Sequence, residues 1–353
     1  MRRSRLRAVT AALLGVLALA LPGAARGVPA PAVAAATELP DPPDVLVTDQ
    51  ASKRLLLLDG SRGTWDPGAD PSVVKWSFSP VGDPRYADLD PERSWVYPDE
   101  AKVRTRRGRT YVLITASFGF AAVVEYPSGG RYWGGALAPG GIELNPHSIE
   151  LLPDGDVAVA ASTGGVVRLY AAARSAPGHG RARGNADEHG PYASYPLAEA
   201  HGLQWDPRLK VLWALGRDRL VALRPGGTAE RPTLTSSFEV PLPGPHGHDL
   251  LRVAGRPDRL WVTTGSAVLQ YSTTRRAFVQ DFAGAREVSR ANVKAVGNDP
   301  LTGGVVSTAP ERGLAETWWT QRVTVHRPDG SRHFFRLVDG GVYKARWWLP
   351  APV

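Results

Sequence analysis

The sequence of 353 residues contains no cysteine, so neither a disulfide bond nor a lipid attached through cysteine is possible. A domain without disulfides must be held together by its apolar core, and a chain of this length can bury enough surface to do so. Long apolar runs are also scarce. The run from Ala8 to Leu21 is too short for a comfortable membrane span, so no membrane anchor is expected.

That apolar run follows a basic start and precedes small residues, which is the pattern of a secretory signal. We expect residues 1–36 to be a signal peptide and processing region, with cleavage after Ala25 or after Ala36. Arg2 and Arg3 do not begin a full twin-arginine motif, so export by the general secretory route is favoured. Residues 37–43 then form a linker, residues 44–353 form a single domain, and the mature protein is predicted to be secreted and monomeric.

Clustered positive charge is missing as well. The formal net charge is +8, but residues 1–36 hold five arginines and no acid, which leaves about +3 (8 − 5) on the rest. The remaining cations are spread along the chain without the basic stripe that a nucleic-acid binder needs to displace counterions. No nucleic-acid partner is therefore expected.

Familiar catalytic motifs are absent too: there is no Gly-x-Ser-x-Gly, no His-Glu-x-x-His and no phosphate-binding Gly-Lys-Ser/Thr loop. A sustained helical period is also absent. The chain has instead short runs of strand length, separated by Gly, Pro, Asp and Ser.

A short segment that mixes polar and apolar residues recurs six times, with first residues 48, 54, 45, 45 and 52 positions apart. The copies begin at Asp99, His147, His201, His246, Ala291 and Tyr343. Repetition at this period is typical of propellers and other repeat architectures. With three further strands per repeat, the pattern predicts an all-β, six-bladed β-propeller of four-stranded blades. A β-sandwich would explain the many strands but not the six-fold register.

The last segment of the chain can supply the strand that the first repeat lacks. The segment Tyr343 to Leu349 has no strands after it, and the first unit at Val45 lacks an opening strand. The C-terminal strand is therefore expected to enter the first blade and to close the ring, which removes exposed sheet edges.

The first strand of each blade should line the central channel, so the repeats predict two rings of side chains there. The outer ring is formed by the six first residues named above. The deeper ring, three positions on, consists of Lys102, Glu150, Gln204, Asp249, Lys294 and Arg346. Buried charges need partners, and pairs such as Lys102 with Glu150 and Asp249 with Lys294 would supply them. The deeper ring is thus either a structural ion-pair network or a site for an acidic or sugar-like ligand, with Asp99 and Lys344 as further contacts.

Three histidines occupy one equivalent position in consecutive repeats, and a fourth lies two residues beyond the third. These residues, His147, His201, His246 and His248, are candidate ligands for a divalent metal such as Zn or Mn. The alternative is that each His-Gly forms a turn whose imidazole bonds to backbone carbonyls. Tryptophans on long segments, namely Trp76, Trp95, Trp318 and Trp319, could stack on sugar rings at the mouth or wedge blades together.

Several of these motifs resemble one family of secreted bacterial propellers, the domain of unknown function 6528. They are Asn145-Pro-His-Ser, Ala200-His-Gly-Leu-Gln-Trp-Asp-Pro, Pro245-His-Gly-His-Asp-Leu and Tyr343-Lys-Ala-Arg-Trp-Trp. The resemblance implies the propeller but brings no activity. The His-Gly segments are distantly similar to six-bladed NHL and SMP-30-like propellers, some of which bind a metal on the axis. The acidic metal ligands typical of SMP-30-like enzymes have no clear match at these ring positions.

The sequence leaves three functions open. The first is a propeller that binds a small molecule or a glycan at the mouth of its channel. The second is a metal-assisted lyase or hydrolase acting on an oligosaccharide, with Lys102, Lys294 or Tyr343 as acid or base. The third is a protein-interaction scaffold, in which the deeper ring serves stability alone.

Overall fold

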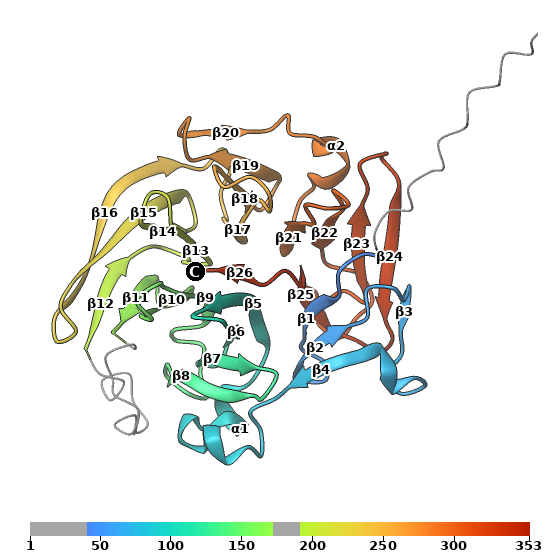
Figure 1. Cartoon of the computed structure of the whole chain (residues 1–353), viewed down its shortest axis with the longest axis horizontal. Coiled ribbons are helices and arrows are strands. Elements are labelled where there is room, and N and C mark those ends of the chain that lie inside the picture. The colour runs from blue at the N-terminus through green and yellow to red at the C-terminus, as the bar shows by residue number, and fades with distance from the viewer. Residues whose placement is uncertain (1–40, 172–190) are drawn as a thin grey trace, which may run out of the picture. The chain divides into compact units, whose positions relative to one another are not determined.

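In the computed structural model, which describes residues 41–171 and 191–353, six β-sheets surround a central axis (Figure 1). The described residues confirm the predicted six-bladed propeller, and each blade contains four antiparallel strands from the axis outward. Blade 1 contains β25 (Val342–Trp347), β1 (Val45–Asp49), β2 (Arg54–Leu58) and β4 (Val74–Phe78). Blade 2 contains β5 (Pro98–Arg106), β6 (Arg109–Ala116), β7 (Phe120–Tyr126) and β8 (Gly130–Ala136).

The other four blades follow in chain order. Blade 3 contains β9 (Pro146–Leu151), β10 (Val157–Ala161), β11 (Val166–Tyr170) and β12 (Tyr192–Pro196). Blade 4 contains β13 (Gly202–Asp206), β14 (Val211–Leu215), β15 (Arg219–Gly227) and β16 (Pro232–Pro241). Blade 5 contains β17 (Leu250–Arg252), β18 (Arg259–Thr263), β19 (Val268–Ser272) and β20 (Ala277–Val279). Blade 6 contains β21 (Ala295–Asn298), β22 (Val305–Thr308), β23 (Arg322–His326) and β24 (Arg332–Leu337).

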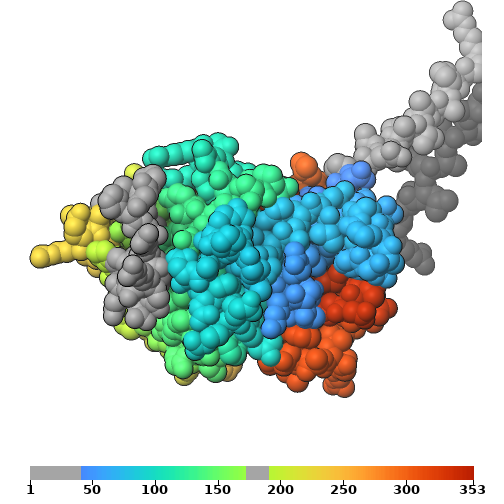
Figure 2. Space-filling model, turned by 90° about the horizontal axis from the view of Figure 1, so that it is seen from below, coloured from blue at the N-terminus to red at the C-terminus, as the bar shows by residue number. Residues whose placement is uncertain are grey.

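The ring is closed by the C-terminal strand, as the sequence predicts. Strand β25 pairs with β1 in an antiparallel register that joins Val45 to Trp347 and Val47 to Ala345. A second closure was not predicted: β3 (Thr64–Trp65) adds to blade 6 by pairing in parallel with β24. In the edge view the red residues of the C-terminal part therefore lie beside the blue residues of the N-terminal part (Figure 2).

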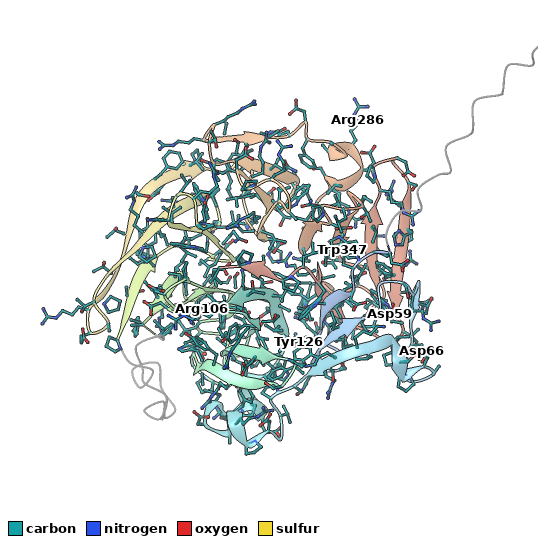
Figure 3. The ribbon with its side chains drawn as sticks, in the orientation of Figure 1. Asp59, Asp66, Arg106, Tyr126, Arg286 and Trp347 are labelled. Atoms are coloured by element: carbon teal, nitrogen blue, oxygen red, sulfur yellow. The ribbon has the colours of Figure 1, made fainter. Side chains whose placement is uncertain are left out.

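Apolar packing between blades explains how the fold is stable without disulfides. The buried apolar residues form six clusters, and each cluster joins one pair of neighbouring blades. Trp205, Trp213, Trp261 and Trp347 each belong to one of these clusters, as expected for wedges between blades. Trp347, labelled in Figure 3, packs in the cluster that joins blades 1 and 6. Truncating one such buried side chain to alanine typically costs about 3–5 kcal/mol.

Helices are short in the described residues: α1 (Pro91–Ser94), α2 (Ala285–Val288) and two 3-10 turns, Pro71–Val73 and Pro84–Leu89. Across the described ranges, no helix is long and apolar enough to cross a membrane. The connection between blades 1 and 2 carries α1 and contributes Tyr86, Leu89 and Trp95 to the core between those blades. The predicted signal region 1–36 lies outside the described residues.

A fifth strand joins blade 2 on its inner side. After β25 the chain turns and forms β26 (Ala351–Pro352), which pairs in parallel with Arg104 and Thr105 of β5. In Figure 1 this segment runs from β25 toward the axis, where the chain ends. The C-terminal tail therefore lies across one end of the channel, and the sequence pattern did not indicate this.

Candidate functional site

The six inner strands bring polar side chains from distant parts of the chain to the channel. Side chains alternate between the two faces of a strand. Glu100, Lys102 and Arg104 therefore lie on the same face of β5, and Lys344 and Arg346 lie on the same face of β25. These five side chains are buried. Burial of so many charged groups is costly unless they are paired, so the arrangement of partners decides what the channel can do.

At the start of the inner strands, three imidazoles and a phenol form a cluster that we call the mouth cluster: His147, His201, His248 and Tyr343. The rings of His147 and His201 are stacked with centroids 4.5 Å apart, and those of His201 and His248 are 4.7 Å apart. Tyr343 and His248 share a hydrogen bond of 2.9 Å between the phenol oxygen and Nε2. Side chains from blades 1, 3, 4 and 5 thus meet at one end of the channel.

The prediction that His246 belongs to this ring is wrong. Its side chain is 67% exposed, and its Nδ1 lies 3.2 Å from Glu199 Oε2 at the surface. His246 adopts a positive φ of 61°, and this turn displaces the register so that His248 takes the ring position. Ala291, the fifth predicted member, is also exposed, whereas Lys294, three residues further on, is half-buried.

Burial keeps the mouth cluster uncharged at neutral pH. It lowers the pKa of His147 and His248 well below the ordinary value, and nearby His201, Lys294 and Lys344 lower these pKa values further. The pKa of His201 falls to about 4, mainly through burial. Burial also raises the pKa of the Tyr343 phenol well above its usual value. Neutral imidazoles can each donate one hydrogen bond and accept another, which suits polar, uncharged groups of a ligand.

Asp99 adjoins the cluster, as the sequence predicts. Ser117 donates a 2.7 Å hydrogen bond to Oδ2, and Gln50 donates one of 3.4 Å to Oδ1. Burial raises the pKa of this carboxyl well above its ordinary value. His147 Nδ1 lies 3.7 Å from Asp99 Oδ1, beyond hydrogen-bond distance, and this nitrogen is buried without a partner among the described residues.

Lys294 contributes an ammonium group next to the cluster. Its side chain is half-buried, and across residues 41–171 and 191–353 no carboxylate forms an ion pair with it. The predicted pair with Asp249 is therefore absent from this structure. Burial and the neighbouring charge of Lys344 lower the pKa of Lys294. The mouth thus carries a cation whose counterion the described residues do not supply.

An ion-pair network lies below the mouth. The sequence predicted paired charges there, but the pairs in the structure are different ones. Arg346 binds both oxygens of Asp249, at 2.5 and 2.7 Å, and Glu100 at 3.1 Å. Lys344 lies 3.2 Å from Glu100 and 3.3 Å from Asp249. Although burial opposes ionisation, the charges of Lys344, Lys102 and Arg346 hold the pKa of Glu100 below its ordinary value. Glu100 was missed because it lies between the two positions that the repeats aligned.

The predicted pair of Lys102 and Glu150 is also replaced. Lys102 donates hydrogen bonds to Ser148 Oγ at 2.8 Å and to the carbonyl of Leu203 at 2.6 Å, and its nearest carboxylate is Glu100 at 3.5 Å. Glu150 instead accepts two hydrogen bonds from Arg104, at 2.8 and 2.7 Å. Lys102 is therefore buried and its ammonium group is bonded to protein groups. Lys294 and Tyr343 remain the acid or base candidates at the mouth.

Two of the candidate metal ligands bond to groups of the protein itself. His201 Nδ1 lies 2.9 Å from the carbonyl of Glu199, and His248 Nε2 is engaged by Tyr343. The bond to Glu199 is of the kind expected for a His-Gly turn. Within the part of the chain that the structure describes, no three His, Asp or Glu side chains form a group that could hold a metal ion.

Of the four tryptophans considered for the mouth, two lie near it. Trp318 and Trp319, on the connection between β22 and β23, both donate to Gln50 Oε1, at 2.9 and 2.6 Å, and Gln50 in turn contacts Asp99. Trp95 is buried between blades 1 and 2. Trp76 packs on Tyr126 and donates to the carbonyl of Pro127 at the outer edge of these blades, so neither reaches the mouth.

Comparison with solved structures finds other proteins of similar shape at low sequence identity. A protein of unknown function from Bacteroides caccae is 11% identical with a TM-score of 0.49, covering 86% of this chain and 98% of that one. Virginiamycin B lyase from Staphylococcus aureus is 10% identical with a TM-score of 0.43, covering 68% of this chain and 84% of the lyase. No activity can be transferred to this chain at such identities and scores.

No match to the sequence was found among curated proteins. A family model does match: the Family of unknown function (DUF6528) covers residues 68–351, which include the four strands of each of blades 2 to 6, strands β4 and β25 of blade 1, and the whole mouth cluster. The match extends over well over half of the chain and agrees with the resemblance carried by the His-Gly motifs. The protein therefore belongs to the DUF6528 family.

Proposed function

We propose that this protein binds a small molecule or glycan at the mouth of its channel, and that the ligand carries a carboxylate among hydroxyl groups. The observation that carries the proposal is that side chains from four blades meet in one cluster, and that some of its hydrogen-bonding groups have no partner. His147 Nδ1 is buried without a partner, and Lys294 has no carboxylate partner among the described residues. Buried polar atoms normally have partners, so these two groups support a ligand that supplies them.

Charge at the mouth favours an acidic ligand. The imidazoles and the Tyr343 phenol are neutral at neutral pH, and burial raises the pKa of Asp99, which opposes its ionisation. Lys294 is then the dominant charge, and an ammonium in a partly dry site attracts a carboxylate strongly. Neutral imidazoles beside it offer paired donors and acceptors for hydroxyl groups. A uronic acid residue of an oligosaccharide combines both features, and export of the chain by residues 1–36 would bring it to such ligands.

A second candidate function is elimination or hydrolysis of the same ligand. It is favoured by the 2.9 Å hydrogen bond between Tyr343 and His248, because a neutral imidazole can take a proton while a phenol donates one. Lys294 would stabilise the charge that develops on the carboxylate. Hydrolysis adds one water to the products and elimination does not, so mass spectrometry of the products distinguishes the two reactions.

The proposal is tested by titrating the protein calorimetrically with trigalacturonate and with the neutral trisaccharide of galactose. We expect saturable binding of the acidic sugar, and binding about tenfold weaker in Lys294→Met, since a charged hydrogen bond contributes about 1.5–3 kcal/mol. Lys210→Met, which removes an exposed lysine, should bind as the wild type does. Equal affinity for the acidic and neutral sugars, or equal affinity of the two variants, would contradict the proposal.

A further inference from the structure

The opposite end of the channel contains a second, separate group of cations. Strands β5, β13, β17 and β25 place Arg104, Gln204, Arg252 and Arg346 around a cavity of about 120 Å³. Apolar side chains complete its wall, including Leu251, Trp347 and Leu349. None of the mouth cluster lines this cavity.

The C-terminal tail forms part of the wall. Ala351 and Pro352 line the cavity, and the pairing of β26 with β5 holds them there. Val353 extends the contact by donating its backbone N–H to the carbonyl of Thr105 at 3.2 Å. In Figure 1 the tail crosses this end of the channel, so the cavity lies beneath a segment that belongs to the same chain.

Two of the three guanidinium groups are neutralised by carboxylates. Arg104 is bonded to both oxygens of Glu150, and Arg346 is bonded to Asp249 and Glu100. Arg252 differs, because its side chain donates to the backbone carbonyl of Trp205 at 2.5 Å and forms no ion pair with a carboxylate in the described ranges. A neutral carbonyl stabilises a guanidinium less than a carboxylate does.

Around the ion-pair network below the mouth, cations outnumber carboxylates. The carboxylates there are Glu100, Glu150 and Asp249, and the cations are Lys102, Arg104, Arg252, Lys344 and Arg346. The difference is two positive charges (5 − 3). Burial and the nearby charge of Arg104 lower the pKa of Arg252, although the charges of Glu150 and Asp206 oppose this shift.

An unused donor is present in the same wall. Arg346 is only 3% exposed, and its Nε–H has no acceptor among the described residues, although both terminal nitrogens are bonded. A buried donor left without a partner destabilises the structure, so a ligand group that accepts a hydrogen bond from it is bound more tightly. A carboxylate can accept from two guanidinium groups at once.

We propose that this cavity is a second ligand site, which binds a small monocarboxylic acid. Its carboxylate accepts hydrogen bonds from Arg252 and from Arg346 Nε, and its short alkyl group packs against Leu251, Trp347 and Leu349. The apolar wall distinguishes this ligand from an inorganic anion, which gains nothing from such contacts. This site is independent of the mouth cluster, and its ligand differs from the sugar acid proposed there.

Calorimetric titration with sodium propionate at constant ionic strength tests the proposal. We expect saturable binding by the wild type and binding at least about tenfold weaker in Arg252→Gln, since charged hydrogen bonds contribute about 1.5–3 kcal/mol. Arg256→Gln removes an exposed arginine of the same blade and is the matched control. His201→Ala, at the mouth, should also bind propionate with wild-type affinity.

Circular dichroism establishes that each variant is folded. If Arg252→Gln does not fold, Leu349→Ala removes part of the apolar wall from a half-buried position in the tail and should weaken binding several-fold. Absence of saturable binding by the wild type, or equal affinity of Arg252→Gln and Arg256→Gln, would overturn the proposal. Inorganic phosphate binding as tightly as propionate, with the same dependence on Arg252, would overturn the assignment of a carboxylic acid.

Discussion

Tyr343 and His248, 95 residues apart in the sequence, share a hydrogen bond of 2.9 Å at the mouth of the channel. One comes from the last inner strand and the other from the segment that precedes β17, so the bond exists only when the ring is closed. Ring closure and the assembly of the mouth cluster are thus the same structural event.

The first prediction concerns pH and stability. An imidazole titrates near pH 6.5 in the unfolded chain, whereas the pKa of His201 in the folded protein is about 4. Between these values the unfolded state binds more protons, so the free energy of unfolding falls as pH decreases from about 6.5 to about 4 and this contribution then levels off. His201 alone accounts for about 3 kcal/mol of this loss.

Urea unfolding at several pH values measures this effect. His201→Gln should show a smaller decrease in the free energy of unfolding across that window than the wild type. His246→Gln, which changes an exposed histidine, should keep the wild-type slope. An identical slope in all three proteins would show that His201 is not buried in its neutral form.

The second prediction concerns the ion-pair network. Arg346→Met removes the guanidinium that binds Asp249 and Glu100, and leaves two buried carboxylates with less compensation. Breaking a buried ion pair in this way costs about 3–5 kcal/mol of unfolding free energy. The control is Arg219→Met, which breaks a surface pair with Glu239 and should cost no more than about 1 kcal/mol. Equal losses in the two variants would contradict the structural role of the network.

The third prediction compares the closing strand β25 with the C-terminal tail that follows it. Deleting residues 342–353 removes β25 and exposes the edge of β1, so this chain should aggregate on size-exclusion chromatography. Deleting residues 349–353 removes only the tail and β26, so this chain should remain monomeric and folded. A monomeric, folded product of the longer deletion would show that the ring does not require its closing strand.

The fourth prediction concerns export. Expression of the full chain in a secreting bacterial host should release a shortened protein, since residues 1–36 have the pattern of a signal peptide. N-terminal sequencing should find a new start after Ala25 or after Ala36. Replacing the apolar Leu13 and Leu14 by Arg should keep the protein inside the cell, and release of this variant at the normal level would contradict the assignment.

The propeller and its closure could be predicted from the sequence because both depend on periodic, local signals. The repeat spacing gave the blade number, and the missing first strand of the opening unit indicated where Tyr343 to Leu349 must pair. The tail strand β26 could not be predicted, because two residues carry no periodicity. The family match over residues 68–351 agrees with the same repeats.

The site was predicted less completely. His147, His201 and Tyr343 lie at the mouth, whereas the ring position of the next repeat was assigned to His246 and is taken by His248. A positive φ at His246 turns that side chain to the surface, and a sequence does not show such a turn directly. The ion pairs of Glu100 with Lys344 and Arg346, and of Arg104 with Glu150, were missed because ion pairs depend on side-chain reach across blades, not on strand register.

The central claim is that the mouth cluster is where the ligand binds, and His248 and His246 test it most directly. The two histidines are two residues apart, yet one lies in the cluster and the other on the surface. Calorimetric titration with trigalacturonate should show that His248→Ala weakens binding about tenfold while His246→Ala leaves it unchanged. Unchanged binding in His248→Ala, or an equal loss in both variants, would contradict the account.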